Sequence, residues 1–160
     1  MTGRVFRAAL AALLGMTCML TCSFARAEEG GGFVRQVTEL SVSAGARSFR
    51  YLRTASGLSV NGHDADQEVF DTLLRQIVSA SMCEPAAFTP EGDPLMTVSA
   101  QSPSGQRLMR FFADKQDQSR VYVLISGRGA DEQGTTDAWR VGTILMACEG
   151  SQLTHEGEAP

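Results

Sequence analysis

The sequence predicts an α+β domain: an antiparallel sheet with two helices, in an element order that fits a βββα unit repeated twice, and one disulfide. Segments with alternating apolar and polar residues fall into two groups of three. Each group is followed by a segment with helical spacing, with one cysteine near its end. The 160 residues, 43% hydrophobic and 20% charged, fit one globular domain. The two halves share an element order without a convincing residue-by-residue similarity.

The first three strands are predicted at residues 33–43, 47–53 and 58–60. In the first, Leu40 and Val42 alternate with serine and glutamate, which is the pattern of a half-buried strand. Glycine-containing turns at residues 44–46 and 55–57 reverse the chain, and Asn61 with Gly62 ends the third strand.

An amphipathic helix is predicted next, ending near Ser81 because three prolines follow between residues 85 and 94. Asp64 is placed to cap its first turn, with Gln67 as a capping-box partner. Asp71 and Arg75 have the spacing of a favourable i,i+4 pair. The buried side of this helix is predicted from six residues at helical spacing: Val69, Phe70, Leu73, Leu74, Ile77 and Val78.

Three more strands are predicted at residues 95–101, 106–113 and 120–126. Residues 121–125 are apolar on both faces and predict a strand inside the sheet. A flexible loop is expected at 127–134. A second helix follows from the spacing of Val141, Ile144, Leu145 and Cys148, with Thr136 or Asp137 as its cap.

The first 27 residues are typical of a cleaved export signal. Arg4 and Arg7 precede an apolar stretch, and cleavage after Ala27 would leave Glu28 first. A membrane anchor is the first alternative, but the apolar run is shorter than a bilayer requires and is interrupted by polar residues, so no stable membrane insertion is expected. A lipoprotein acylated on Cys22 is the second, although the residues before that cysteine do not fit.

The predicted domain spans residues 33–149, between mobile segments at 28–32 and 150–160. The net charge is −4, and removal of residues 1–27 leaves eleven basic and eighteen acidic residues, a net charge of −7. Nucleic acid is therefore not expected as a partner, because phosphate binding requires the opposite balance. The protein is expected in the periplasm or outside the cell.

Cys83 and Cys148 remain after signal removal, and an exported chain with two cysteines predicts a structural disulfide. This bridge requires the two helix ends to lie near each other on one face of the sheet. A redox pair or metal site is the alternative, which lacks a CxxC spacing or a nearby histidine.

His63 and Asp64 are the candidate acid–base residues, since they place an imidazole beside a carboxylate. The alternative is that the aspartate caps a helix and the histidine is solvated. The only other histidine, His155, lies in the predicted tail. The sequence has no convincing motif for a metal or a cofactor, and none is expected.

Arginine is frequent on the predicted strands. Strand positions fix side-chain directions, so several of these side chains can converge on an exposed sheet face and bind an anionic ligand or an acidic protein surface. Alternatively, they protect sheet edges and pair with acidic residues. The candidate binding residues are Arg35, Arg50, Arg53 and Arg110.

These patterns favour a small exported binding or interaction module, without catalytic machinery, whose partner is an envelope protein or an anionic ligand. One alternative is a secreted or periplasmic hydrolase that uses His63 and Asp64. Another is a secreted inhibitor or effector. The sequence leaves the oligomeric state open.

Overall fold

The computed structural model describes residues 35–127 and 131–153, with side chains described as far as Ser151. The predicted signal peptide with its cleavage site, segment 28–32 and the last part of the predicted tail lie outside these residues. None of the described helices is both long enough and apolar enough to cross a bilayer.

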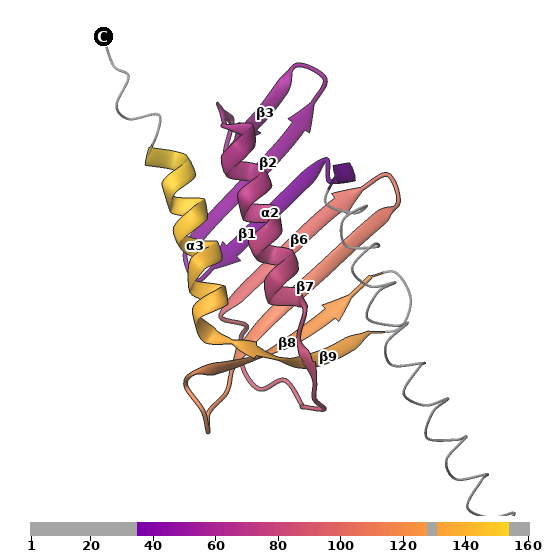
Figure 1. The fold of residues 1–160 in the computed structure, drawn as a ribbon, viewed down its shortest axis with the longest axis vertical. Helices are drawn as coiled ribbons and strands as arrows, with labels where there is room; N and C mark the ends of the chain where they lie inside the picture. Colours follow the sequence, from indigo (N-terminus) through magenta and orange to yellow (C-terminus); the bar gives the residue numbers. More distant parts are fainter. Residues whose placement is uncertain (1–34, 128–130, 154–160) are drawn as a thin grey trace, which may run out of the picture. The chain divides into compact units, whose positions relative to one another are not determined.

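The described residues form one antiparallel sheet with two helices on one face, which confirms the predicted α+β class (Figure 1). The sheet order is β4-β3-β2-β1-β6-β7-β8-β9-β5. The strands are β1 (Glu39–Ala44), β2 (Arg47–Thr54), β3 (Gly57–Val60), β4 (His63–Asp64), β5 (Glu84–Pro85), β6 (Met96–Ser102), β7 (Gly105–Ala113), β8 (Arg120–Ser126) and β9 (Glu132–Asp137). The helices are α2 (Gln67–Ser81) and α3 (Ala138–Leu153).

The two halves of the sheet meet at β1 and β6, which pair antiparallel with Val42 opposite Val98. Each half continues outward as a meander, β1-β2-β3 on one side and β6-β7-β8 on the other. The antiparallel junction turns the second half around relative to the first. As a result, α2 and α3 run in opposite directions side by side (Figure 1).

The core lies between the sheet and the helices because alternate strand residues point to the helix side. Its largest fully buried side chains include Leu40, Tyr51, Phe70, Phe111 and Ile144. The opposite sheet face is polar over β1 and β2. Over β7 and β8 it is covered in part, where Phe88 stacks on Tyr122 with a 4.7 Å centroid separation and Phe112 is only 5% exposed.

Several predicted boundaries are wrong. The first strand begins at Glu39, and residues 35–36 are helical. The predicted loop contains β9, which lacks apolar side chains and is held by pairing with β8 and β5. Helix α3 continues to Leu153, four residues into the predicted tail. The structure also contains three strands that the predicted βββα repeat does not include, namely the short strands β4 and β5 and the additional β9.

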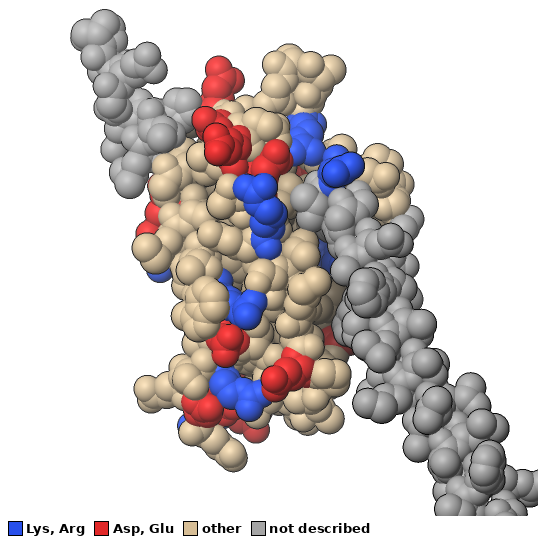
Figure 2. Space-filling model, viewed as in Figure 1, with Lys and Arg blue, Asp and Glu red and all other residues tan. Residues whose placement is uncertain are grey.

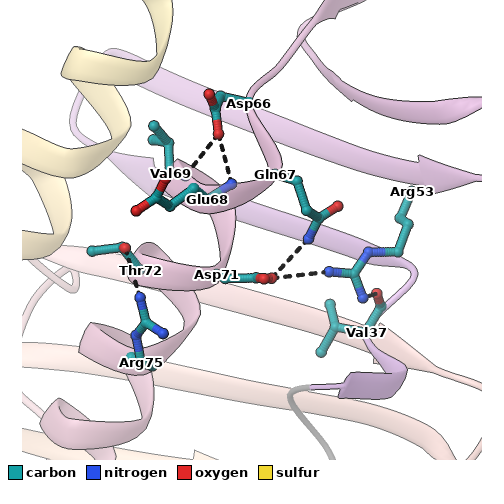
Figure 3. A network of polar contacts seen from close by, with 9 residues as sticks. All are labelled: Val37, Arg53, Asp66, Gln67, Glu68, Val69, Asp71, Thr72 and Arg75. Atoms are coloured by element: carbon teal, nitrogen blue, oxygen red, sulfur yellow. Dashed lines mark hydrogen bonds and ion pairs between the residues drawn. The ribbon is translucent and has the colours of Figure 1, made fainter.

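Asp66, not Asp64, caps α2 (Figure 3). Its carboxylate accepts hydrogen bonds from the backbone N–H groups of Glu68 at 2.6 Å and Val69 at 3.3 Å. Asp64 belongs to β4, because that short strand extends the sheet up to two residues before the helix.

The expected pair between Asp71 and Arg75 is also replaced (Figure 3). Asp71 accepts from Gln67 at 2.7 Å and from Arg53 at 3.3 Å, while Arg75 donates to the Thr72 hydroxyl. The sheet lies beneath α2, so a strand arginine reaches Asp71 and anchors the first turns of the helix.

Candidate functional site

The predicted arginine face does not form as a cluster. Arg50 and Arg53 are three residues apart on β2 and therefore point to opposite faces. Arg53 lies on the helix side, where it binds Asp71 and stands 5.0 Å from the centroid of Phe70. Its role is to attach α2 to the sheet. Arg35 lies in the helical residues before β1 and is exposed.

Arg50 and Arg110 do share the face opposite the helices. Three strand spacings separate their rows, about 14 Å, because β1 and β6 lie between β2 and β7. Arg50 pairs with the Glu39 carboxylate at 2.8 Å. Arg110 lies between Thr97 and Leu124. The two guanidinium groups therefore do not form a common anion site.

His63 and Asp64 occupy edge strand β4, where both are exposed. As neighbours on a strand they point to opposite faces. Within the described residues, no cluster of three or more histidine, cysteine, aspartate or glutamate side chains could hold a metal. The structure therefore directs the His63 and Asp64 side chains away from each other.

The predicted disulfide is absent: Cys83 and Cys148 are not joined. Each cysteine belongs to the C-terminal part of its helix or just beyond it, so a bridge would need parallel helices. The helices are antiparallel, and Arg140 in the first turn of α3 donates to the Ser79 carbonyl near the end of α2 at 3.4 Å. Cys148 is eight residues further along α3, about 12 Å away along the axis.

Cys148 is instead a core residue beside Tyr51. Its side chain is fully buried, and burial raises the pKa of the thiol to about 12. The Tyr51 hydroxyl hydrogen-bonds the Ser151 hydroxyl at 2.7 Å, which extends the packing of α3 on β2. A thiol that stays protonated at neutral pH is not a nucleophile.

A polar cavity of about 340 Å³ lies where α2 ends and α3 begins. Arg120 donates to the Thr135 hydroxyl and lies 3.3 Å from the Glu84 carboxylate, while Arg140 lies 3.2 Å from the Asp137 carboxylate. These contacts fix the orientation of both arginines, and a carboxylate beside each one balances its charge. The cavity is lined by Met82, Glu84, Ser119, Arg120, Thr135, Thr136, Asp137 and Arg140.

A second cavity, of about 300 Å³, lies on the opposite sheet face beside Phe88, Phe112 and Tyr122. The ion pair between Lys115 and Glu91 lines it as well. The aromatic rings contact one another, so they cover that part of the sheet and complete a small second core.

The side of α3 that points away from the sheet is apolar, in contrast to an ordinary surface helix. Trp139 is 63% exposed and Met146 is 71% exposed. Gly142 and Gly150 are exposed on the same side, and a Cβ added to either would meet no atom within 4 Å. We call these four residues the outer stripe of α3.

The glycines of the outer stripe carry a cost that packing within the chain does not explain. Glycine in a helix destabilises it by about 0.5–1 kcal/mol relative to alanine. Open space around Gly142 and Gly150 means that alanine would fit at both. Positions without a side chain next to large exposed apolar residues are suited to the close approach of another backbone.

Figure 2 shows the helix face of the molecule. Over α3 this surface is mostly neutral, whereas acidic residues gather where α2 begins. Only Arg140 and Glu149 are charged within α3. Sequence reasoning identified the buried side of this helix and missed the outer stripe, although the spacing of Trp139, Gly142, Met146 and Gly150 was a signal that could have revealed it.

Neither a family model, nor a curated protein, nor a solved structure matches this chain.

Proposed function

We propose that this protein is a small exported interaction module that acts by binding another protein through the outer stripe of α3. The observation that carries the proposal is a helix with a large apolar residue exposed at Trp139 and another at Met146. Burial of exposed apolar area provides the main driving force for protein association.

The fold supports this role because it holds α3 rigidly from its inner side. Val141, Ile144 and Cys148 are buried against the sheet. Arg140 lies 5.0 Å from the centroid of the Trp139 ring, which restricts the orientation of the indole. A preorganised surface loses less conformational entropy on binding.

Photo-crosslinking in cells tests the proposal. A photoreactive aromatic amino acid at position 139 replaces an exposed ring with another, and the same amino acid at Ser43 places the probe on the opposite sheet face. We expect a protein adduct from position 139 and little from position 43. Absence of any protein adduct from position 139 would contradict the proposal.

The destination of the protein is part of the same proposal. An exported product should begin at Glu28, which the intact mass of the natural protein tests directly. Cell fractionation then distinguishes a periplasmic module from a secreted inhibitor or effector. A natural product that retains Met1 would contradict export by signal cleavage.

A small anionic ligand is the second candidate, favoured by the two oriented arginines of the polar cavity. Titration with inorganic phosphate and with acetate, followed by NMR shifts, tests it against Arg120→Ala. Saturable binding that this variant abolishes would support a ligand site. The Glu84 and Asp137 carboxylates in the same cavity oppose an anion, so protein binding ranks first. The hydrolase alternative has less support, since His63 and Asp64 face apart.

A further inference from the structure

The outer stripe of α3 is a short seam with an eleven-residue spacing, which follows one side of a helix for three turns. Trp139, Gly142, Met146 and Gly150 are separated by three, four and four residues, so they follow one another along a single side of the helix. A seam of this kind is matched by a second helix. Its occupant is therefore expected to present a helix of similar length.

The residues of this seam alternate in the order large, small, large, small. Two antiparallel copies of the seam therefore place each large residue opposite a small one. Along the helix, the midpoint between Gly142 and Met146 falls at Ile144. The midpoint between Trp139 and Gly150 falls directly after it. When a second α3 is laid antiparallel about that point, each large side chain faces a glycine. A twofold interface requires such self-complementarity.

We propose that the partner of α3 is a second copy of this chain, whose own α3 packs antiparallel on the outer stripe. In this dimer, Trp139 of each copy covers Gly150 of the other, and Met146 covers Gly142. The inference rests on the proposed function and names the partner of the same surface. It also gives the exposed helix glycines a physical role, since they let the two backbones approach.

Charge is consistent with a second copy. The chain is acidic, so two copies repel each other over most of their surfaces. The outer stripe carries no charge, which lets copies meet there without like-charge contact. Antiparallel packing also brings the end of one α3, where Glu149 pairs with Arg47 of its own chain, near the N-terminus of the other α3 without opposing like charges.

The available area predicts a weak dimer. A 16-residue helix is about 24 Å long, and Trp139 exposes on the order of 150 Å². A contact limited to α3 lies near or below the roughly 1,200 Å² at which stable interfaces begin. We therefore expect association in the micromolar range or weaker, with monomers at low concentration.

Sedimentation velocity of the purified natural protein, from low micromolar to near-millimolar concentration, tests the dimer. We expect Met146→Glu to weaken association by about tenfold or more. Ser43→Glu adds the same charge on the exposed opposite sheet face and should leave association unchanged. Gly142→Ala should raise the melting temperature of the monomer while it weakens the dimer.

Crosslinking tests the register, in a Cys83→Ser background. Mixed Gly142→Cys and Met146→Cys proteins should form a disulfide between copies, whereas Trp139→Cys alone should not, because its two copies would lie about 16 Å apart along the axis. Efficient self-crosslinking of Trp139→Cys would overturn the antiparallel arrangement.

A wild-type protein that stays monomeric at the highest concentration would overturn the second copy as partner. The proposed function would still stand if the photoreactive probe at position 139 captured a different protein in cells. A captured species of twice the chain mass supports both proposals. No adduct together with no dimer would contradict both.

Discussion

Helices α2 and α3 lie side by side on the same sheet but differ in how their outer sides are used. The first turns of α2 are held by polar contacts to Asp66, Arg53 and Gln67, and its outer side carries charged and polar residues. The outer side of α3 carries Trp139 and Met146, with Gly142 between them and Gly150 one turn after Met146. The contrast fits a role in folding for α2, and under the proposed function a further role in binding for α3.

The largest expected difference between the two helices is in how much a truncated side chain lowers the free energy of unfolding. Leu73→Ala in α2 should lower it by about 2–5 kcal/mol, because Leu73 is fully buried and the change leaves a cavity. Met146→Ala in α3 should change it by less than about 0.5 kcal/mol. Urea denaturation of dilute protein measures both. A large loss for Met146→Ala would mean that the outer stripe belongs to the core.

Arg53 and Arg50 of β2 should also differ in how much each contributes to the free energy of unfolding. Arg53→Ala should cost about 1–2 kcal/mol, because it removes the contacts with Asp71, the Val37 carbonyl and the Phe70 ring. Arg50→Ala, which breaks an exposed pair with Glu39, is the matched control and should leave the free energy of unfolding nearly unchanged. Equal losses in urea denaturation would contradict the assignment of Arg53 to helix anchoring.

Alkaline pH should affect the attachment of α3 to the sheet. Burial raises the pKa of Cys148 to about 12, from 9.0 for an ordinary thiol, and burial also raises the pKa of Tyr51. Above pH 9 the unfolded chain loses the thiol proton while the native protein keeps it. Stability should therefore fall with rising pH between these values, by about 1.4 kcal/mol per pH unit for one proton.

The pH slope of the urea midpoint measures this effect. Cys148→Ala should reduce the slope, and Tyr51→Phe should reduce it further towards the upper end of the range. A slope that Cys148→Ala leaves unchanged would show that the thiol is not the group responsible.

The smallest expected effect concerns the start of α2. Asp66→Ala should cost about 1 kcal/mol, because two backbone N–H groups lose their acceptor. Asp64→Ala, two residues earlier on β4, should stay within about 0.5 kcal/mol of the wild type. Thermal unfolding of the two variants measures these losses. A larger loss for Asp64→Ala than for Asp66→Ala would identify Asp64 as the cap.

Much of the fold could be predicted because its elements have local signals. The strand predicted at 120–126 is β8, and the predicted α2 ends at Ser81 as expected. β9 could not be predicted, because its pattern is polar and only its neighbours hold it in the sheet. Gly134 is needed there, since a Cβ would meet the Glu84 carbonyl oxygen at 2.5 Å.

The candidate site was less accessible to sequence reasoning. Arginine frequency suggested a binding face, but alternation along β2 sends Arg50 and Arg53 to opposite sides. The outer stripe was visible as a spacing. Its meaning depends on knowing that Val141, Ile144 and Cys148 already face the sheet, which leaves Trp139 and Met146 outside.

The sequence by itself determined the class of fold, because the periods of two and 3.6 residues are local properties of the chain. Only the tertiary structure decided how the halves join. Antiparallel pairing of β1 with β6 reverses the second half, so the helices run oppositely and Cys83 is separated from Cys148. That choice involves residues far apart in the chain, and no local pattern records it.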